Sequence, residues 1–75
     1  MAYIAKSVLV AGAASDTLAT AVSNLNTAVG TAVTAALAAS NYIDRSVKVI
    51  PGNTFSKDDG TGITCTATVQ YYTSA

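Results

Sequence analysis

Apolar and polar side chains alternate without interruption over the range 63–72. Successive side chains of a β-strand point to opposite faces of a sheet, so this alternation predicts a strand. The apolar face, which we expect to line the core, holds Ile63, Cys65, Ala67, Val69 and Tyr71. The other face is polar without being charged and holds Thr64, Thr66, Thr68, Gln70 and Tyr72.

The range 2–11 also predicts a strand, but apolar side chains occur on both of its faces. One face holds Tyr3, Ala5, Leu9 and Ala11, and the other holds Lys6 with Ile4, Val8 and Val10. A strand that is apolar on both sides is usually covered on both sides. We therefore expect something besides the chain's own helix to pack on this sheet, with Val8 and Val10 in the contact.

A further strand is predicted over the range 42–50. Pro51-Gly52 is expected to end it, because proline cannot donate a hydrogen bond to a sheet. The polar range 53–62 contains an Asp59-Gly60 turn signal. We expect this range to be the long loop of a hairpin that leads into the strand at 63–72.

The range 17–39 has the period of a helix. Large apolar side chains recur every three or four residues and form one stripe, made of Leu18, Val22, Leu25, Val29, Val33 and Leu37. Ser15 or Asp16 is the expected N-terminal cap, and Asn41 is the expected left-handed stop. Gly30 lies in the middle, and the pattern leaves open whether the helix bends or splits there.

The predicted order is β-α-β-β within one small domain, residues 1–75. After the long helical crossover, the first strand either runs parallel to the second or pairs antiparallel with the third. We favour the antiparallel pairing. The sequence therefore predicts an α+β fold, in which one long helix packs on one face of a three-stranded antiparallel sheet.

The back of this helix is unusual, because no charged residue occurs from Thr17 to Ile43. A helix that faces water normally carries Lys, Glu and Arg on its outer side. Small uncharged side chains instead allow a second surface to approach closely. We predict that the back packs on a neighbouring subunit, through Thr20, Thr27 and Thr31 and a ridge of Ala28, Ala32 and Ala36.

Two other interpretations of the helix stay open. Small residues four apart also mark the packing faces of membrane helices. However, the most apolar part, 28–39, is much shorter than the roughly 20 residues that a span needs, so we expect no membrane. The remaining alternative is an ordinary amphipathic helix with an unusual surface composition.

Composition excludes several classes of function. Four basic and four acidic residues cancel, and histidine is absent. Without a basic excess to neutralise phosphates, we expect no nucleic-acid partner. The chain has no glutamate and four carboxylates in all, which leaves general acid–base catalysis little to work with. We predict that the protein is not an enzyme and has no catalytic residues.

Cys65 is the single cysteine, so an intrachain disulfide is impossible. Without histidine, the common zinc sites and a Cys-His nucleophile are excluded as well. We expect Cys65 to be a small buried side chain, and we expect no metal or cofactor. A core of this size usually supplies only ~3–5 kcal/mol, so association with other copies is the expected stabiliser.

Three further features carry candidate chemistry. Asp58 and Asp59 lack the ligand spacing of a calcium loop, and we expect a solvated turn there. The range 12–15 precedes the helix but lacks the glycine pattern of a phosphate loop. Tyr71 and Tyr72, with Tyr3 and Tyr42, are expected in an interface or the core, with stacking on a planar ligand as the alternative.

The β-α-β-β order in so short a chain is similar to that of the dodecins, small flavin-storing shells of twelve subunits. The resemblance covers element order only. The dodecin flavin site is built around a tryptophan, and this chain has none. The resemblance therefore implies no site residue and no cofactor here.

These patterns lead to two expectations of function. The first is a non-enzymatic, self-associating structural subunit, most concretely a phage or virion decoration protein or another shell or filament component. The alternative is a small-molecule-binding oligomer, a dodecin-like storage or sequestration protein with its ligand held between subunits. We expect a homo-oligomer located in a virion or the cytoplasm, rather than a secreted protein that depends on disulfides.

Overall fold

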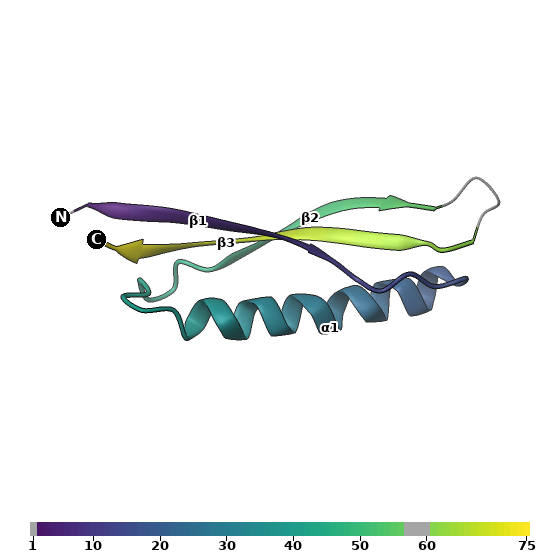
Figure 1. Cartoon of the computed structure of the whole chain (residues 1–75), viewed down its shortest axis with the longest axis horizontal. Helices are drawn as coiled ribbons and strands as arrows, with labels where there is room; N and C mark the ends of the chain where they lie inside the picture. Colours follow the sequence, from purple (N-terminus) through teal and green to yellow (C-terminus); the bar gives the residue numbers. More distant parts are fainter. Residues whose placement is uncertain (1, 57–60) are drawn as a thin grey trace.

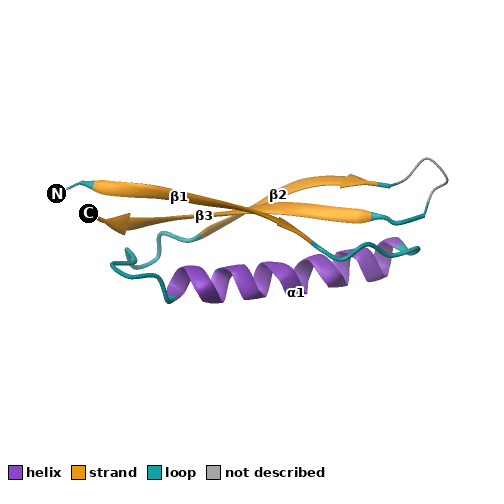
Figure 2. Ribbon diagram, viewed as in Figure 1, coloured by secondary structure: helices purple, strands orange, loops and turns teal. Residues whose placement is uncertain are grey.

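A computed structural model of the chain describes residues 2–56 and 61–75. Four elements follow one another: β1 (Tyr3–Ala11), α1 (Leu18–Leu37), β2 (Lys48–Phe55) and β3 (Thr64–Ser74). The strands form one antiparallel sheet in the order β1-β3-β2, and α1 lies along one side of it (Figures 1 and 2). The predicted α+β class and the antiparallel pairing of the first and last strands are confirmed.

β3 is the central strand, and its pairing aligns apolar residues in rows across the sheet. Val8 of β1 and Val49 of β2 both stand opposite Val69 of β3. Directly opposed residues of an antiparallel pair share a face. Val69, Cys65 and Ala67 are buried, as their alternation predicts. We call this face the inner face, because α1 packs on it, and the opposite one the outer face.

β2 differs from the prediction, which ended the strand at Pro51. The strand continues through Pro51 to Phe55, with a register shift between Pro51 and Thr54. Proline is tolerated because β2 is an edge strand, where an N–H that points away from the sheet has no partner to lose. The Thr66 hydroxyl holds the irregular part, since it accepts from the Asn53 N–H (2.9 Å) and donates to the Asn53 carbonyl (3.2 Å).

The segment before β2 forms turns instead of the predicted strand. Asn41 and Arg45 both adopt left-handed φ values, 61° and 63°. α1 ends at Leu37 with Ala38 as its C-cap, so Asn41 lies in the turns that follow and is not the stop that was expected. Side-chain and backbone bonds tie this segment to β3. The Ser46 hydroxyl accepts from the Tyr72 N–H (3.0 Å), and the Ile43 N–H donates to the Tyr72 carbonyl (2.9 Å).

α1 is continuous through Gly30, so the glycine does not split it. Its N-cap is Thr17, whose hydroxyl accepts a backbone N–H of the first turn at 3.4 Å, and the expected caps Ser15 and Asp16 are wrong. The helix starts later because Ser15 still belongs to the sheet, where it pairs with Ile63.

Alanines, together with half of the stripe of large apolar residues, line the side of α1 that meets the sheet. Ala21 and Ala36 are buried, and Ala28 and Ala32 are half-buried against the core around Val69. We call these four residues the alanine seam. The predicted apolar stripe is divided: Leu25, Val29 and Val33 are half-buried against the core, whereas Leu18, Val22 and Leu37 are exposed.

The fold is long and thin. Its extents are 51 × 18 × 14 Å. Its radius of gyration is 14.5 Å, against about 11 Å for a compact domain of this length. A single helix on a three-stranded sheet gives two layers and few fully buried side chains.

Candidate self-association surface

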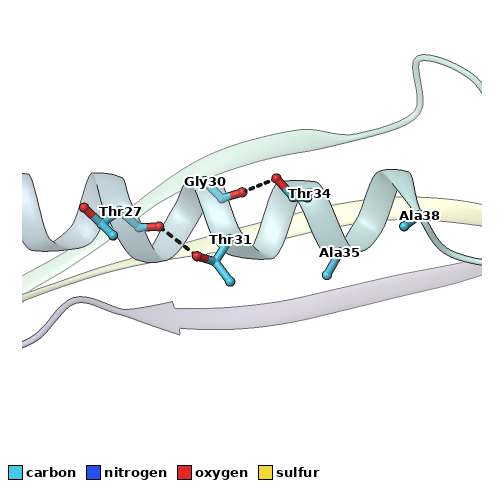
Figure 3. A pocket seen from close by; sticks show the side chains of 6 residues that line it. All are labelled: Thr27, Gly30, Thr31, Thr34, Ala35 and Ala38. Carbon is cyan, nitrogen blue, oxygen red and sulfur yellow. Dashed lines mark hydrogen bonds between the residues drawn. The ribbon is translucent and has the colours of Figure 1, made fainter.

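The side of α1 that points away from the sheet is uncharged, and its threonines bond to their own helix. The hydroxyl of Thr27 donates to the Ser23 carbonyl (3.3 Å). The hydroxyls of Thr31 and Thr34 donate in the same way to the carbonyls of Thr27 (3.2 Å) and Gly30 (2.9 Å) (Figure 3). Such back-bonding uses the hydroxyl proton within the helix. The surface left for a neighbour is made of methyl groups and hydroxyl oxygens.

A shallow groove runs along this side of α1. Its lining is Thr27, Gly30, Thr31, Thr34, Ala35 and Ala38. Among the described residues, nothing lies within 4 Å of where a Cβ on Gly30 would stand. Thr31 and Ala35 point toward the side of the helix on which β1 runs (Figure 3). Both flanking side chains are small, so another helix could approach closely from that side.

Five of the interface residues expected from the sequence are exposed in the single chain. They are Val8, Thr20, Thr27, Thr31 and Tyr72. Tyr71 is half-buried, and its ring lies 6.3 Å from that of Tyr42 at an angle of 49°. Tyr71 therefore belongs to the margin of the core, in an edge-tilted aromatic pair.

The other four expected interface residues contact the chain's own core. Val10 and Ala36 are buried in it, and Ala28 and Ala32 are half-buried against it. Val10 and Ala36 are covered by this chain, so the expected contact with a second subunit is wrong for these two residues. For the half-buried Ala28 and Ala32 it stays a prediction. The small side chains of the alanine ridge do allow close packing, but the surface that packs on them is the sheet of the same chain.

A flank of α1 that the sequence assigned to the core is instead exposed. It consists of Leu18, Val22 and Leu37, all more than two-fifths exposed. α1 packs mainly on β3 and β1, and the inner-face side chain of Val49 on β2 is exposed as well. The chain therefore leaves apolar surface uncovered on both layers.

The outer face of the sheet carries the largest exposed apolar groups. Within the described chain, α1 covers the inner face alone (Figure 2). Leu9 is 76% exposed, Tyr3 is 64% exposed, and Phe55 and Tyr72 are each about half exposed. A small apolar hollow is lined by Tyr3, Ile43 and Tyr72. The two-sided apolar pattern of β1 predicts that something outside the single chain covers this face.

The described residues bring together no cluster of reactive side chains. Cys65 is buried, and its sulfur lies 3.6 Å from the Thr54 hydroxyl. Within residues 2–56 and 61–75, no three His, Cys, Asp or Glu side chains gather where a metal could bind. Asp58 and Asp59 lie outside the described residues, so the expected turn there is not described.

Two backbone donors of the turn before α1 are engaged by β3 and the residue preceding it. The Gly12 and Ser15 N–H groups donate to the carbonyls of Cys65 and Ile63, both at 3.0 Å. An anion at this position would have to compete with the sheet for these donors. In the described part of the chain, no helix is long and apolar enough to cross a membrane.

Comparison with protein-family models, with curated proteins and with solved structures finds no match for this chain.

Proposed function

We propose that this protein is a non-enzymatic structural subunit that associates with copies of itself. The observation that carries the proposal is the apolar surface that one chain leaves open. The accessible surface is 4893 Å², about 650 Å² more than a compact protein of this mass exposes. A standard interface buries about 800 Å² per partner. The excess is therefore of the size that a single contact with another subunit removes.

The most specific form of the proposal is a component of a phage or virion surface, or of another shell or filament. Composition supports it. The chain is short, carries no net charge and has 11% charged residues, whereas a freely soluble surface carries about 25–35%. Near-zero net charge favours association because copies do not repel one another.

Light scattering coupled to size-exclusion chromatography tests the proposal. We expect a mass of at least two chains at micromolar concentration. A mass equal to the single chain, 7.5 kDa, would refute it. A Leu9→Thr variant should stay folded and lose part of the association, because it removes the most exposed apolar side chain of the sheet.

A second candidate function rests on the hollow between Tyr3, Ile43 and Tyr72. Two tyrosines beside an apolar side chain suit a planar ligand held between subunits. Melting curves with flavins and nucleotides test this function. A rise in Tm that the Tyr72→Ala variant abolishes supports it, and unchanged melting across the panel refutes it.

A further inference from the structure

The sheet has two edges, and they differ in how open they are to another strand. The β2 edge is interrupted by Pro51, which lacks an N–H, and by the register shift between Pro51 and Thr54. Natural proteins protect edge strands with proline and with such irregularities. A second strand therefore finds no continuous ladder along β2.

The β1 edge has neither protection. β1 pairs with β3 over nine consecutive residues, Tyr3 to Ala11, without a register shift. The Gly12 N–H donates to the Cys65 carbonyl, and the Ala75 N–H donates to the Ala2 carbonyl. Because the ladder alternates, even-numbered residues of β1 turn their backbone groups toward β3. The N–H and C=O groups that point away from the sheet belong to Tyr3, Ala5, Ser7, Leu9 and Ala11.

We infer that β1 pairs antiparallel with β1 of a second copy, about a two-fold axis at Ser7. This inference rests on the proposed function and names the surface that carries it. Ser7 is the midpoint of the strand, so this register overlaps all nine residues. Ala5 then stands opposite Leu9 of the second copy on the outer face, and Ile4 stands opposite Val10 of the second copy on the inner face. The product is one continuous six-stranded sheet.

A second copy fits this edge better than an unrelated partner does. An antiparallel strand edge is self-complementary under a two-fold axis, so the same residues serve both sides. The one charged side chain of β1 is Lys6, which projects from the inner face rather than along the edge. Its aliphatic stem can lie across from Val8 of the second copy while its ammonium stays in water.

The exposed area and the position of the helix are compatible with this pairing. The single chain exposes about 650 Å² more than a compact protein of its mass, which is comparable to the area that each partner of a standard interface buries. Gly12 contacts α1 at Leu25, and at ~3.4 Å per strand residue and ~1.5 Å per helix residue Ser7 lies roughly level with Ala36. The two antiparallel helices therefore approach each other only near their C-terminal ends, where Ala35 on the β1 side is small (Figure 3).

Cysteine cross-linking tests the register directly. In the proposed pair, the two Ser7 Cα atoms lie about 5.5 Å apart, which a disulfide spans. The Ala5 Cα atoms lie roughly 14 Å apart at ~3.4 Å per residue, beyond disulfide reach. Ser7→Cys should therefore give a covalent dimer on a non-reducing gel after mild oxidation, and Ala5→Cys should not. The native Cys65 is buried, so it does not form an intermolecular disulfide in either variant.

Equal cross-linking at the two positions, or cross-linking at Ala5→Cys alone, would overturn the inference. Amide exchange on the unmodified protein gives a test without any variant. The outward amides of Ala5, Ser7 and Leu9 should exchange at least about tenfold more slowly than the outward amide of Val49 on the β2 edge. Equal exchange overturns the inference.

The two proposals fail separately. If light scattering gives a single chain, the proposed function fails, and the pairing fails with it. If light scattering gives an oligomer while the β1 amides exchange freely, self-association stands and the β1 edge is not its surface.

Discussion

Gly12 and Leu25 lie so close that a Cβ on Gly12 would stand 2.5 Å from the Leu25 backbone nitrogen. This contact is where the end of β1 passes against α1. The Asn24 side chain fixes it, because its amide donates to the Ala13 carbonyl at 2.9 Å. Only a residue without a Cβ lets the strand and the helix backbone approach this far.

Gly12→Ala should therefore destabilise the fold by about 1–3 kcal/mol, the usual range for overpacking. The neighbouring atoms are backbone and cannot turn aside as a flexible side chain would. Urea denaturation measures the change. A loss below about 0.5 kcal/mol, the range of ordinary surface changes, would contradict the close contact.

Gly30→Ala should have the opposite sign. The position is helical, and its Cβ would meet no described atom within 4 Å. Replacing glycine by alanine in a helix gains up to about 1 kcal/mol. Tm should rise in thermal melting, and a fall would mean that the groove on α1 is filled in the native protein.

The alanine seam predicts a contrast between two changes of the same size. Ala36 is buried at the sheet, whereas Ala19 is exposed. Ala36→Leu should cost about 1–3 kcal/mol, and Ala19→Leu should stay within about 0.5 kcal/mol of the parent. Chemical denaturation of both variants checks the helix orientation. A larger loss of stability for Ala19→Leu than for Ala36→Leu would contradict this orientation of the helix.

The irregular part of β2 depends on Thr66. Thr66→Val removes both bonds to Asn53 and should cost about 1 kcal/mol, since water reaches the freed groups. Thr68→Val is the matched control, because its hydroxyl makes no side-chain bond among the described residues and valine favours strands. Unfolding free energies that do not differ between the two would show that Thr66 does not hold the bulge.

Much of the fold follows from local pattern. The strict alternation around Val69 predicted the central strand and its buried face, and the long periodic run predicted one helix. The element order and the antiparallel pairing of β1 with β3 were predicted as well. The elements follow from side-chain period, which is visible in a single sequence, whereas the pairing was favoured from the long helical crossover.

The predictions that were wrong concern features that depend on contacts between elements distant in the sequence. Pro51 signals a strand end locally, but an edge position removes its cost. Leu18, Val22 and Leu37 are more apolar than the alanine seam, yet they stay exposed while the seam packs on the sheet. A hydrophobic pattern reports which side chains avoid water, and it does not report whether one chain or two will cover them.

Which edge of the sheet is open could not be predicted from the sequence. β1 and β2 both have apolar residues and few charges. Their difference depends on which backbone groups point away from β3, and therefore on register. The outward N–H groups of Ala5, Ser7 and Leu9 became visible only once β1 was paired.

Sedimentation velocity across a micromolar concentration series tests self-association most directly. We predict a boundary heavier than a single 7.5-kDa chain, with the lighter species growing only on dilution. A single boundary with the mass of one chain at every concentration would contradict the central claim, because the exposed apolar side chains would then be stable in water without a partner.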